Sequence, residues 1–252
     1  MKLNKHQIDA SLQRISNILQ INGGFLNNPG LYTGEMGLAL FFSVYSRFTH
    51  DELYLEYSQL LIENLQENLH SQTPIDYRHG LTGIGSTFEY LVQKGYFDAD
   101  TDVILEDFDE RIFTFDKFPF LSFDELSGIA HYAYWRLSGN SRKKETISKT
   151  ILPQVVYFME VKSENAEVEH PLVSFFKGII STDTLQLCSD NHPFQLESEP
   201  YKRLMERFIK ADYSDKNAFH FGVQNGLAGF GLCLIYEIYS DDSWKALFPF
   251  RH

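Results

Sequence analysis

Apolar residues recur at helical spacing along most of this 252-residue chain, and strict alternation of apolar and polar residues never persists beyond a few positions. Two kinds of predicted helix follow one another. The segment 38–45 is apolar on nearly all sides, which is typical of a buried helix. The segment 52–67 carries a single apolar stripe of Leu53, Tyr57, Leu60, Leu61 and Leu65. The pattern predicts an all-α fold in which inner helices alternate with amphipathic outer helices.

Short glycine-rich segments, here called glycine heads, accompany four of the apolar helices. Residues 225–231 read NGLAGFG and residues 79–85 read HGLTGIG, while residues 31–37 and 126–130 are weaker copies. We expect these heads to be structural repeats at helix starts. Their glycines are Gly34, Gly37, Gly80, Gly83, Gly85, Gly128, Gly226, Gly229 and Gly231.

The heads recur at a nearly regular interval. Gly34 and Gly83 are 49 residues apart, Gly83 and Gly128 are 45 apart, and Gly128 and Gly229 are 101 apart. The last interval spans two units, so a degenerate head is expected at Gly178. A period of this length suits one helical hairpin per unit.

Glycine in a helix costs about 1 kcal/mol relative to alanine, so its clustering at helix starts needs a reason. We predict that the inner helices converge on a common axis, where no room is left for a Cβ atom. The alternative is a set of unrelated loop and capping glycines. That alternative does not explain the matched Leu, Thr/Ser/Ala and Ile/Phe positions between the glycines.

Charge and cysteine content exclude several classes of protein. The net charge of −12 argues against nucleic acid as a partner, because phosphate binding needs clustered Lys and Arg. Two cysteines are too few for a disulfide scaffold. The first residues lack the apolar segment of a secretory signal, and no apolar run is long enough to span a bilayer. We therefore expect a cytoplasmic protein without a membrane partner.

Several residues are candidates for chemistry or binding. Histidines in or after a head would serve as a general acid or base in a central cavity, or else play a structural role. The acidic run at 106–110 is interpreted as a solvated helix face. The predicted cavity-lining residues are Tyr32, Glu35, His79, His131, Gln224 and Asn225.

One pair of residues has the spacing of metal ligands. Cys188 and His192 would lie one turn apart on a helix and could share a zinc ion. A third ligand would have to come from His220, His170 or Cys233. Cys233 lies in an apolar helix, where a packed core thiol is the alternative interpretation.

The heads LYTGEMGLA at 31–39, HGLTGIG at 79–85 and NGLAGFGL at 225–232 resemble those of the lanthionine synthetase C-like family. The resemblance covers residues 30–140 and 215–240 well and residues 141–214 poorly. It implies an α/α toroid of helical hairpins. On this basis we expect residues 1–252 to form one toroid-like domain with fewer units than a full ring.

The resemblance also raises the question of zinc. In the cyclases of this family two Cys and one His hold zinc, which lowers the pKa of a peptide thiol so that the thiolate adds to a dehydrated Ser or Thr. Those ligands belong to a Cys-bearing head and to a Cys-His-Gly head, and this chain has neither motif. The metal-bearing units would fall within residues 141–214, which are too few to contain them.

Three functions remain open on the sequence. The preferred hypothesis is a degenerate, metal-free member of the family that binds a peptide or a maturation protein as a non-catalytic accessory. The second is a lanthionine-forming or related enzyme with a relocated zinc site at Cys188 and His192. The third is a helical scaffold whose incomplete ring is closed by a partner or by a second copy of the chain.

Overall fold

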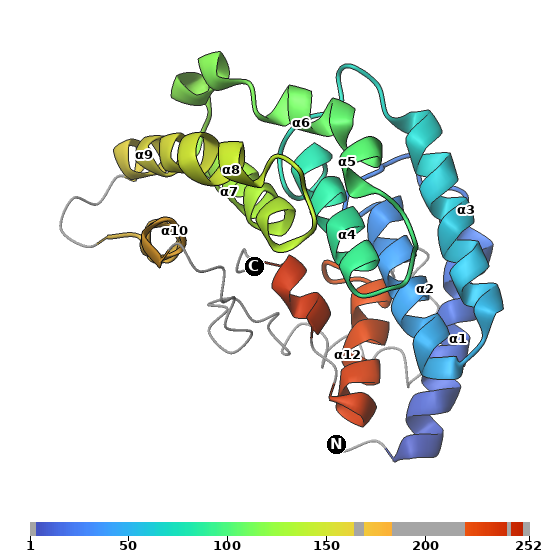
Figure 1. Ribbon diagram of the computed structural model, residues 1–252. Coiled ribbons are helices and arrows are strands. Elements are labelled where there is room, and N and C mark those ends of the chain that lie inside the picture. The colour runs from blue at the N-terminus through green and yellow to red at the C-terminus, as the bar shows by residue number, and fades with distance from the viewer. Residues whose placement is uncertain (1–3, 164–168, 183–219, 241–242, 249–252) are drawn as a thin grey trace. The chain divides into compact units, whose positions relative to one another are not determined.

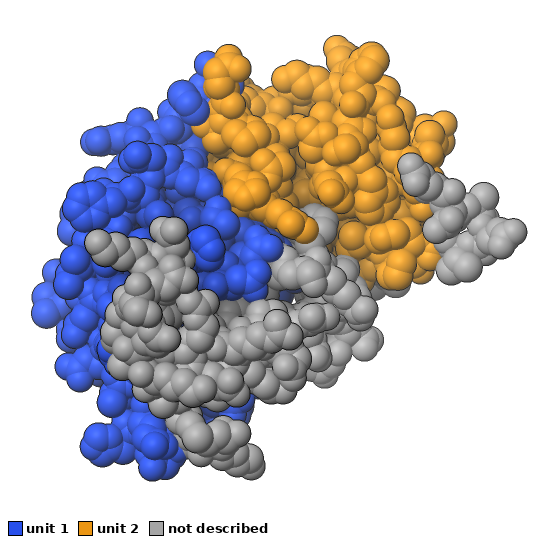
Figure 2. Space-filling view, turned by 180° about the vertical axis from the view of Figure 1, so that it is seen from behind, with its two compact units in different colours: residues 1–71, 194–252 blue, residues 72–193 orange. Residues whose placement is uncertain are grey.

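The computed structural model describes residues 4–163, 169–182, 220–240 and 243–248. Within these ranges the chain is all-α, as predicted: no strand is present there, and the β structure is limited to an isolated bridge between His220 and Gly226. The chain divides into two compact units, residues 1–71 with 194–252 and residues 72–193 (Figure 2). A single toroid-like domain and the incompleteness of its ring stay predictions.

The first unit combines helices from both ends of the chain. α12 packs against α1 and α2, and α3 packs against α2 (Figure 1). A 3₁₀ helix, η4, follows α12. The described helices of this unit are α1 (Lys5–Gly23), α2 (Glu35–Thr49), α3 (Glu52–Asn68), α12 (Leu227–Tyr239) and η4 (Ser243–Leu247).

The inner and outer helices of the first unit differ in burial as their sequences predicted. Every residue of α2 from Glu35 to Ser46 is buried, so this helix is covered on all sides. α3 begins at the predicted cap, where the Asp51 side chain accepts a hydrogen bond from the Leu53 backbone. The pair α2 and α3 is therefore an inner and outer hairpin.

The prediction of one buried apolar stripe on α3 was partly wrong. Leu53 is 66% exposed and Leu60 is 53% exposed, whereas Leu61 and Leu65 are buried. The face of α3 that packs on α2 is centred on Ser58, whose hydroxyl donates to the Ala39 carbonyl at 2.8 Å. This small residue allows the two helices to approach closely. Leu53 and Leu60 lie on the opposite face of α3 and are therefore exposed.

The second unit has two inner helices that pack on each other, α4 and α7. α4 is buried from Leu81 to Leu91 and α7 from Leu126 to Leu137. Short helices and the outer helix α9 surround them (Figure 1). The described helices of this unit are α4 (Leu81–Gln93), α5 (Thr101–Ile104), α6 (Glu106–Ile112), η1 (Phe115–Phe120), α7 (Phe123–Ser138), α8 (Lys144–Thr146), η2 (Ile147–Ile151), α9 (Leu152–Lys162) and α10 (Pro171–Thr182).

Two segments predicted as single helices are interrupted. The acidic segment after Asp100 breaks into α5 and α6 at Leu105, which is fully buried. The long helix predicted for 142–162 contains a π-helical turn, η2, just before Pro153. Proline cannot donate a backbone hydrogen bond to the preceding turn, which accounts for the change of geometry there.

No helix in the described ranges combines the length and the apolar character that crossing a membrane requires. The cytoplasmic location stays a prediction.

Candidate functional site

Three helices begin with the same backbone geometry. The residues that cap α2, α4 and α12 are Gly34, Gly80 and Gly226, all extended, with φ of −121°, −122° and −121°. No side chain caps these starts; the first helical N–H donates instead to a carbonyl of the preceding loop. The pairs are Glu35 to Asn28 at 2.8 Å, Leu81 to Pro74 at 2.9 Å, and Leu227 to His220 at 2.8 Å.

The spacing of these bonds shows that the heads are structural repeats. In each head the donor lies seven residues after the acceptor, so the same closed loop recurs at the three starts. Each loop thereby satisfies helical N–H groups that a helix start leaves without an intrahelical partner. The interpretation of these heads as unrelated loop glycines is excluded.

The reason for glycine at the three caps differs from the one we predicted. A Cβ on Gly34, Gly80 or Gly226 would lie less than 3.0 Å from a backbone carbonyl oxygen of the loop just before it. The crowding therefore comes from each head's own loop. Convergence of helix ends on a shared axis is the wrong reason at these positions.

Helices do approach each other closely further along α4 and α12. A Cβ on Gly85 would meet the ring of Tyr132 on α7, and one on Gly231 would meet the ring of Phe41 on α2, both within 3.0 Å. These two glycines leave space for aromatic rings of a neighbouring inner helix. Close approach between inner helices thus explains Gly85 and Gly231, whereas a Cβ on Gly37 would meet the Leu31 carbonyl of its own head.

The repeat register also needs correction. Gly37, Gly83 and Gly229 are each the third residue of their helix, so Gly34 corresponds to Gly80, and not to Gly83. The third head is different in kind: α7 starts at Phe123 behind a capping box made by Ser122 and Glu125, which places Gly128 inside the helix.

The prediction of a degenerate head at Gly178 was wrong. Gly178 lies within α10, and nothing would come within 4 Å of a Cβ added there. The loop geometry of the other heads therefore has no counterpart at this glycine.

In the first unit, the first and last heads touch. The Gln224 backbone donates to the Tyr32 carbonyl at 2.9 Å, and a Cβ on Gly222 would collide with the backbone of Tyr32 and Thr33. Tyr32 is fully buried, with its ring 5.3 Å from that of Phe248. Asn225 is exposed at a φ of 52°, and Gln224 is half-buried.

In the second unit, the two predicted histidines have opposite environments. His79 is about half exposed, and its Nδ1 lies 3.4 Å from an Asp76 carboxylate oxygen. His131 is fully buried on α7, with its ring 5.4 Å from that of Tyr77 and 5.6 Å from that of Phe176. The surroundings of His131 are those of a packed core residue. A cavity-lining role for either histidine stays a prediction.

Glu35 is the predicted site residue with the least expected environment. It is the first residue of α2 and is only 4% exposed. Its Oε2 atom has no hydrogen-bond partner in the described part of the chain. Burial raises the pKa of the Glu35 carboxyl, while a hydrogen bond with the Asn68 side chain lowers it by a smaller amount.

The second unit contains a buried ion cluster that was not predicted from the sequence. Arg136 on α7 is fully buried and is bonded to Glu89 on α4, to Asp102 at 2.6 Å and to Asp109 at 2.9 Å. Asp109 also accepts a hydrogen bond from the Tyr132 hydroxyl at 2.6 Å. Asp109 is 3% exposed, so the interpretation of the acidic run as a wholly solvated face was wrong.

The pKa shifts in the cluster follow from these contacts. Burial opposes ionisation of Asp102, but hydrogen bonds from the Arg142 backbone, Ser141 and Arg136 lower its pKa overall. Burial beside Asp109 raises the pKa of Tyr132 well above its usual value. The cluster thus holds three carboxyl groups around one guanidinium, and the residues that bond to Arg136 all belong to the second unit.

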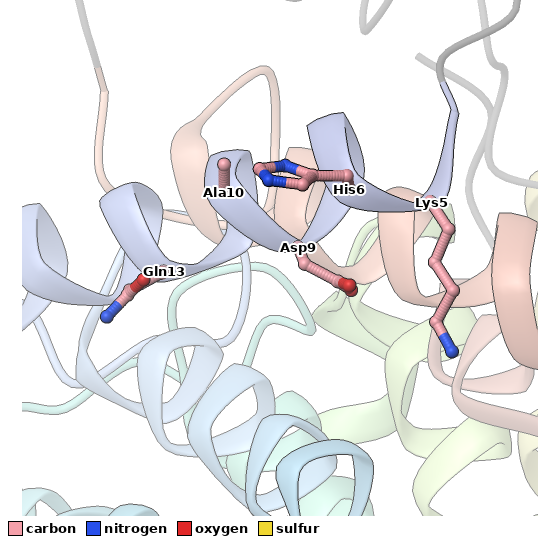
Figure 3. Close-up of a pocket in the computed structure, with 5 residues that line it drawn as sticks. All are labelled: Lys5, His6, Asp9, Ala10 and Gln13. Atoms are coloured by element: carbon pink, nitrogen blue, oxygen red, sulfur yellow. The ribbon is translucent and has the colours of Figure 1, made fainter.

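A hollow in the surface lies away from the predicted site residues. The described residues that line it are all exposed and belong to one stretch of α1 (Figure 3). No residue of a glycine head is among them. The residues are Lys5, His6, Asp9, Ala10 and Gln13.

The chain matches the family model of the lanthionine synthetase C-like protein over residues 26–179, which is more than half of its length. The chain therefore belongs to the lanthionine synthetase C-like family. The match includes the first three heads and extends through residues 141–179, where the resemblance had been weak. Comparisons with curated proteins and with solved structures found no match.

The residues of the described ranges do not fit the zinc ion that the family resemblance implies. Burial raises the pKa of the Cys233 thiol in α12 to about 12, whereas zinc binds the thiolate. Within these ranges no three side chains of His, Cys, Asp and Glu form a group that could hold a metal ion. The pair Cys188 and His192 lies outside the described residues.

Proposed function

We propose that this protein is a non-catalytic, metal-free member of the family that binds a peptide or another maturation protein during peptide modification. The observation that supports this best is the combination of retained heads and missing ligand motifs. The loop geometry recurs at three helix starts, yet no head carries a cysteine or a Cys-His-Gly sequence. Binding needs the preserved framework, while cyclisation would also need a thiolate-binding metal.

The exposed polar groups of the heads support a binding role. His79 and Asn225 are exposed and Gln224 is half-buried, and each is positioned by a loop whose backbone bonds are satisfied. Polar side chains that the protein already holds in place lose little conformational entropy when a peptide binds. We infer that a peptide or protein bound to the first unit contacts Gln224 and Asn225, and that His79 offers a separate contact on the second unit.

An active cyclase with zinc at Cys188 and His192 is the alternative, favoured by the Cys-x3-His spacing of that pair. The two proposals differ in metal content and in turnover. Protein purified without added metal is expected to contain far less than one zinc per chain by elemental analysis. It is also expected to leave the thiol of a synthetic peptide with one cysteine and one dehydroalanine open to maleimide labelling.

The matched control for this experiment is the Cys188→Ala variant. If wild-type protein holds one zinc per chain, loses it in Cys188→Ala, and consumes the peptide thiol, the accessory proposal is wrong and the cyclase alternative is right. Equal, low zinc in both proteins together with an unreacted peptide supports the accessory role.

A second copy of the chain is another proposed partner, and α9 is the observation that favours it. Tyr157 and Val161 lie one turn apart on this helix and are 60% and 61% exposed. Such a pair is suited to packing against another helix. Sedimentation velocity is expected to give a mass above the 29.2 kDa of one chain, and the Tyr157→Lys variant is expected to return to that mass. A monomeric wild type would contradict this proposal.

A further inference from the structure

We propose that Glu35 anchors a cationic group of the bound peptide, the ammonium of a lysine or the guanidinium of an arginine. This inference rests on the proposed peptide-binding function and names the chemistry that one site would recognise. It is carried by a buried carboxyl without a cationic partner and by the end of α3 that lies beside it.

The repeat itself shows that the fold does not need a carboxyl at this position. Glu35, Leu81 and Leu227 are the first residues of α2, α4 and α12, and their backbone N–H groups make the same bond to the preceding loop. Leu81 is 1% exposed and Leu227 is fully buried. The equivalent place in two of the three heads is therefore an apolar core position, and in the first head it holds an acid.

The carboxyl at this position is incompletely satisfied. Buried carboxylates in proteins are ordinarily paired with a cation or fully hydrogen-bonded. Glu35 forms no ion pair with any described residue, and its Oε2 atom has no hydrogen-bond partner there. The start of α2 favours a negative charge, but the two leucines show that this helix geometry forms without one.

The surroundings of Glu35 suit a positive charge. Its hydrogen-bond partner Asn68 is the last residue of α3 and is exposed, so the carboxyl lies close below the surface. A helix C-terminus carries partial negative charge on its last carbonyl groups, and the last turn of α3 contains no basic residue. The Glu35 carboxyl thus lies at a helix C-terminus whose last turn supplies no basic residue, and Glu35 forms no ion pair with the described residues.

A charge-selective binding experiment tests the inference. Three labelled, N-acetylated decapeptides are compared by fluorescence anisotropy at low ionic strength: alternating Lys-Ala, Ser-Ala and Glu-Ala. We expect wild-type protein to bind the Lys-Ala peptide most tightly. Glu35→Leu and Glu35→Gln are each expected to weaken that binding tenfold or more.

The control variant is Glu56→Gln, which makes the same change of net charge at an exposed position of α3. We expect it to change the affinity less than twofold. An equal loss in Glu56→Gln would show diffuse attraction by an acidic surface and overturn the inference. So would equal binding of the Lys-Ala and Ser-Ala peptides by the wild type.

A stability measurement separates a binding role from a structural one. Glu35→Leu restores the residue of the other two heads and removes an incompletely bonded carboxyl, so its melting temperature is expected to rise by about 2–4 °C. A lower melting temperature would mean that Glu35 serves the fold, which overturns the inference. If none of the three peptides binds wild-type protein, peptide binding itself fails; if only the charge preference is absent, the inference fails alone.

Discussion

Replacing Arg136 with methionine is expected to lower the free energy of unfolding of the second unit by about 3–5 kcal/mol. The guanidinium is fully buried and bonds to Glu89, Asp102 and Asp109, whose side chains are 1%, 8% and 2% exposed. The variant leaves Glu89 buried without its cation, while Asp102 and Asp109 keep only their ion pairs with Arg142 at 3.6 Å and with Lys143 at 3.1 Å. Buried carboxylates that lose their shared cation must stay charged with less compensation or take up protons, and both outcomes favour the unfolded state.

The location of the effect follows from the elements that Arg136 connects. Glu89 lies on α4, Asp102 on α5, Asp109 on α6 and Arg136 on α7. Hydrogen exchange measured by mass spectrometry is therefore expected to show lost protection in peptides covering residues 81–93 and 123–138. Chemical denaturation followed by circular dichroism gives the size of the loss.

Arg142→Met is the matched control, because it removes the same charge a short distance along the chain. Arg142 is 73% exposed and pairs with Asp100 and Asp102. Exposed ion pairs contribute about 0–1 kcal/mol, so this variant should be close to wild type. Similar losses in the two variants would show that overall charge, and not the buried cluster, determines stability.

The helices themselves were largely predictable from the sequence. A segment apolar on nearly all sides identified α2 as a buried helix, and Asp51 identified the start of α3. Both signals are local, since they depend on periodicity and capping within one segment. Repetition of the glycine heads then identified the family, which the match over residues 26–179 confirmed.

What the sequence did not predict depends on contacts between distant segments. Asp109 belongs to an acidic run that is typical of a solvated face, but its partners Tyr132 and Arg136 lie 23 and 27 residues later in the chain. A signal was present: Glu89 is the charged residue in the buried stretch 81–91 of α4, and Arg136 is the one in the buried stretch 126–137 of α7, if His131 is counted as neutral. Because an isolated buried charge is costly, two such residues in neighbouring inner helices predict an ion pair.

In the candidate site too, local features were predictable from the sequence, whereas contacts between distant segments were not. The sequence indicated Glu35 as a residue of the first head, but its enclosure depends on how α2 and α3 pack together. Burial of His131 likewise depends on Tyr77 and Phe176, which come from other segments of the second unit. The sequence showed which residues belong to a head, but it did not show whether their side chains are buried or exposed.

Gly80→Ala is expected to destabilise the second unit by about 2–4 kcal/mol. A Cβ at this position would lie less than 3.0 Å from the carbonyl oxygens of both Pro74 and Asp76. Backbone atoms cannot rotate away as a side chain does, so the loop must move. Moving it strains or breaks the bonds from Leu81 to Pro74 at 2.9 Å and from Gly80 to Asp76 at 3.1 Å.

Gly178→Ala makes the same chemical change, but we expect it to raise the free energy of unfolding. Gly178 is an exposed residue of α10 with open space where the Cβ would lie. Alanine there lowers the conformational entropy of the unfolded chain and raises helix propensity, so we expect a gain of about 0.5–1 kcal/mol. Urea denaturation of the two variants and the wild type measures both effects. A loss in Gly178→Ala would mean that position 178 is crowded.

The pattern of hydrogen exchange in Gly80→Ala distinguishes two causes for glycine at the heads. If the loop of residues 74–80 is the obstacle, protection is lost first in that loop and in the opening turn of α4. If a neighbouring inner helix were the obstacle, the loss would extend to α7, as it should for Gly85→Ala, whose Cβ would meet Tyr132. Because Gly34 and Gly226 share the geometry of Gly80, alanine at either is expected to act through its own loop in the same way.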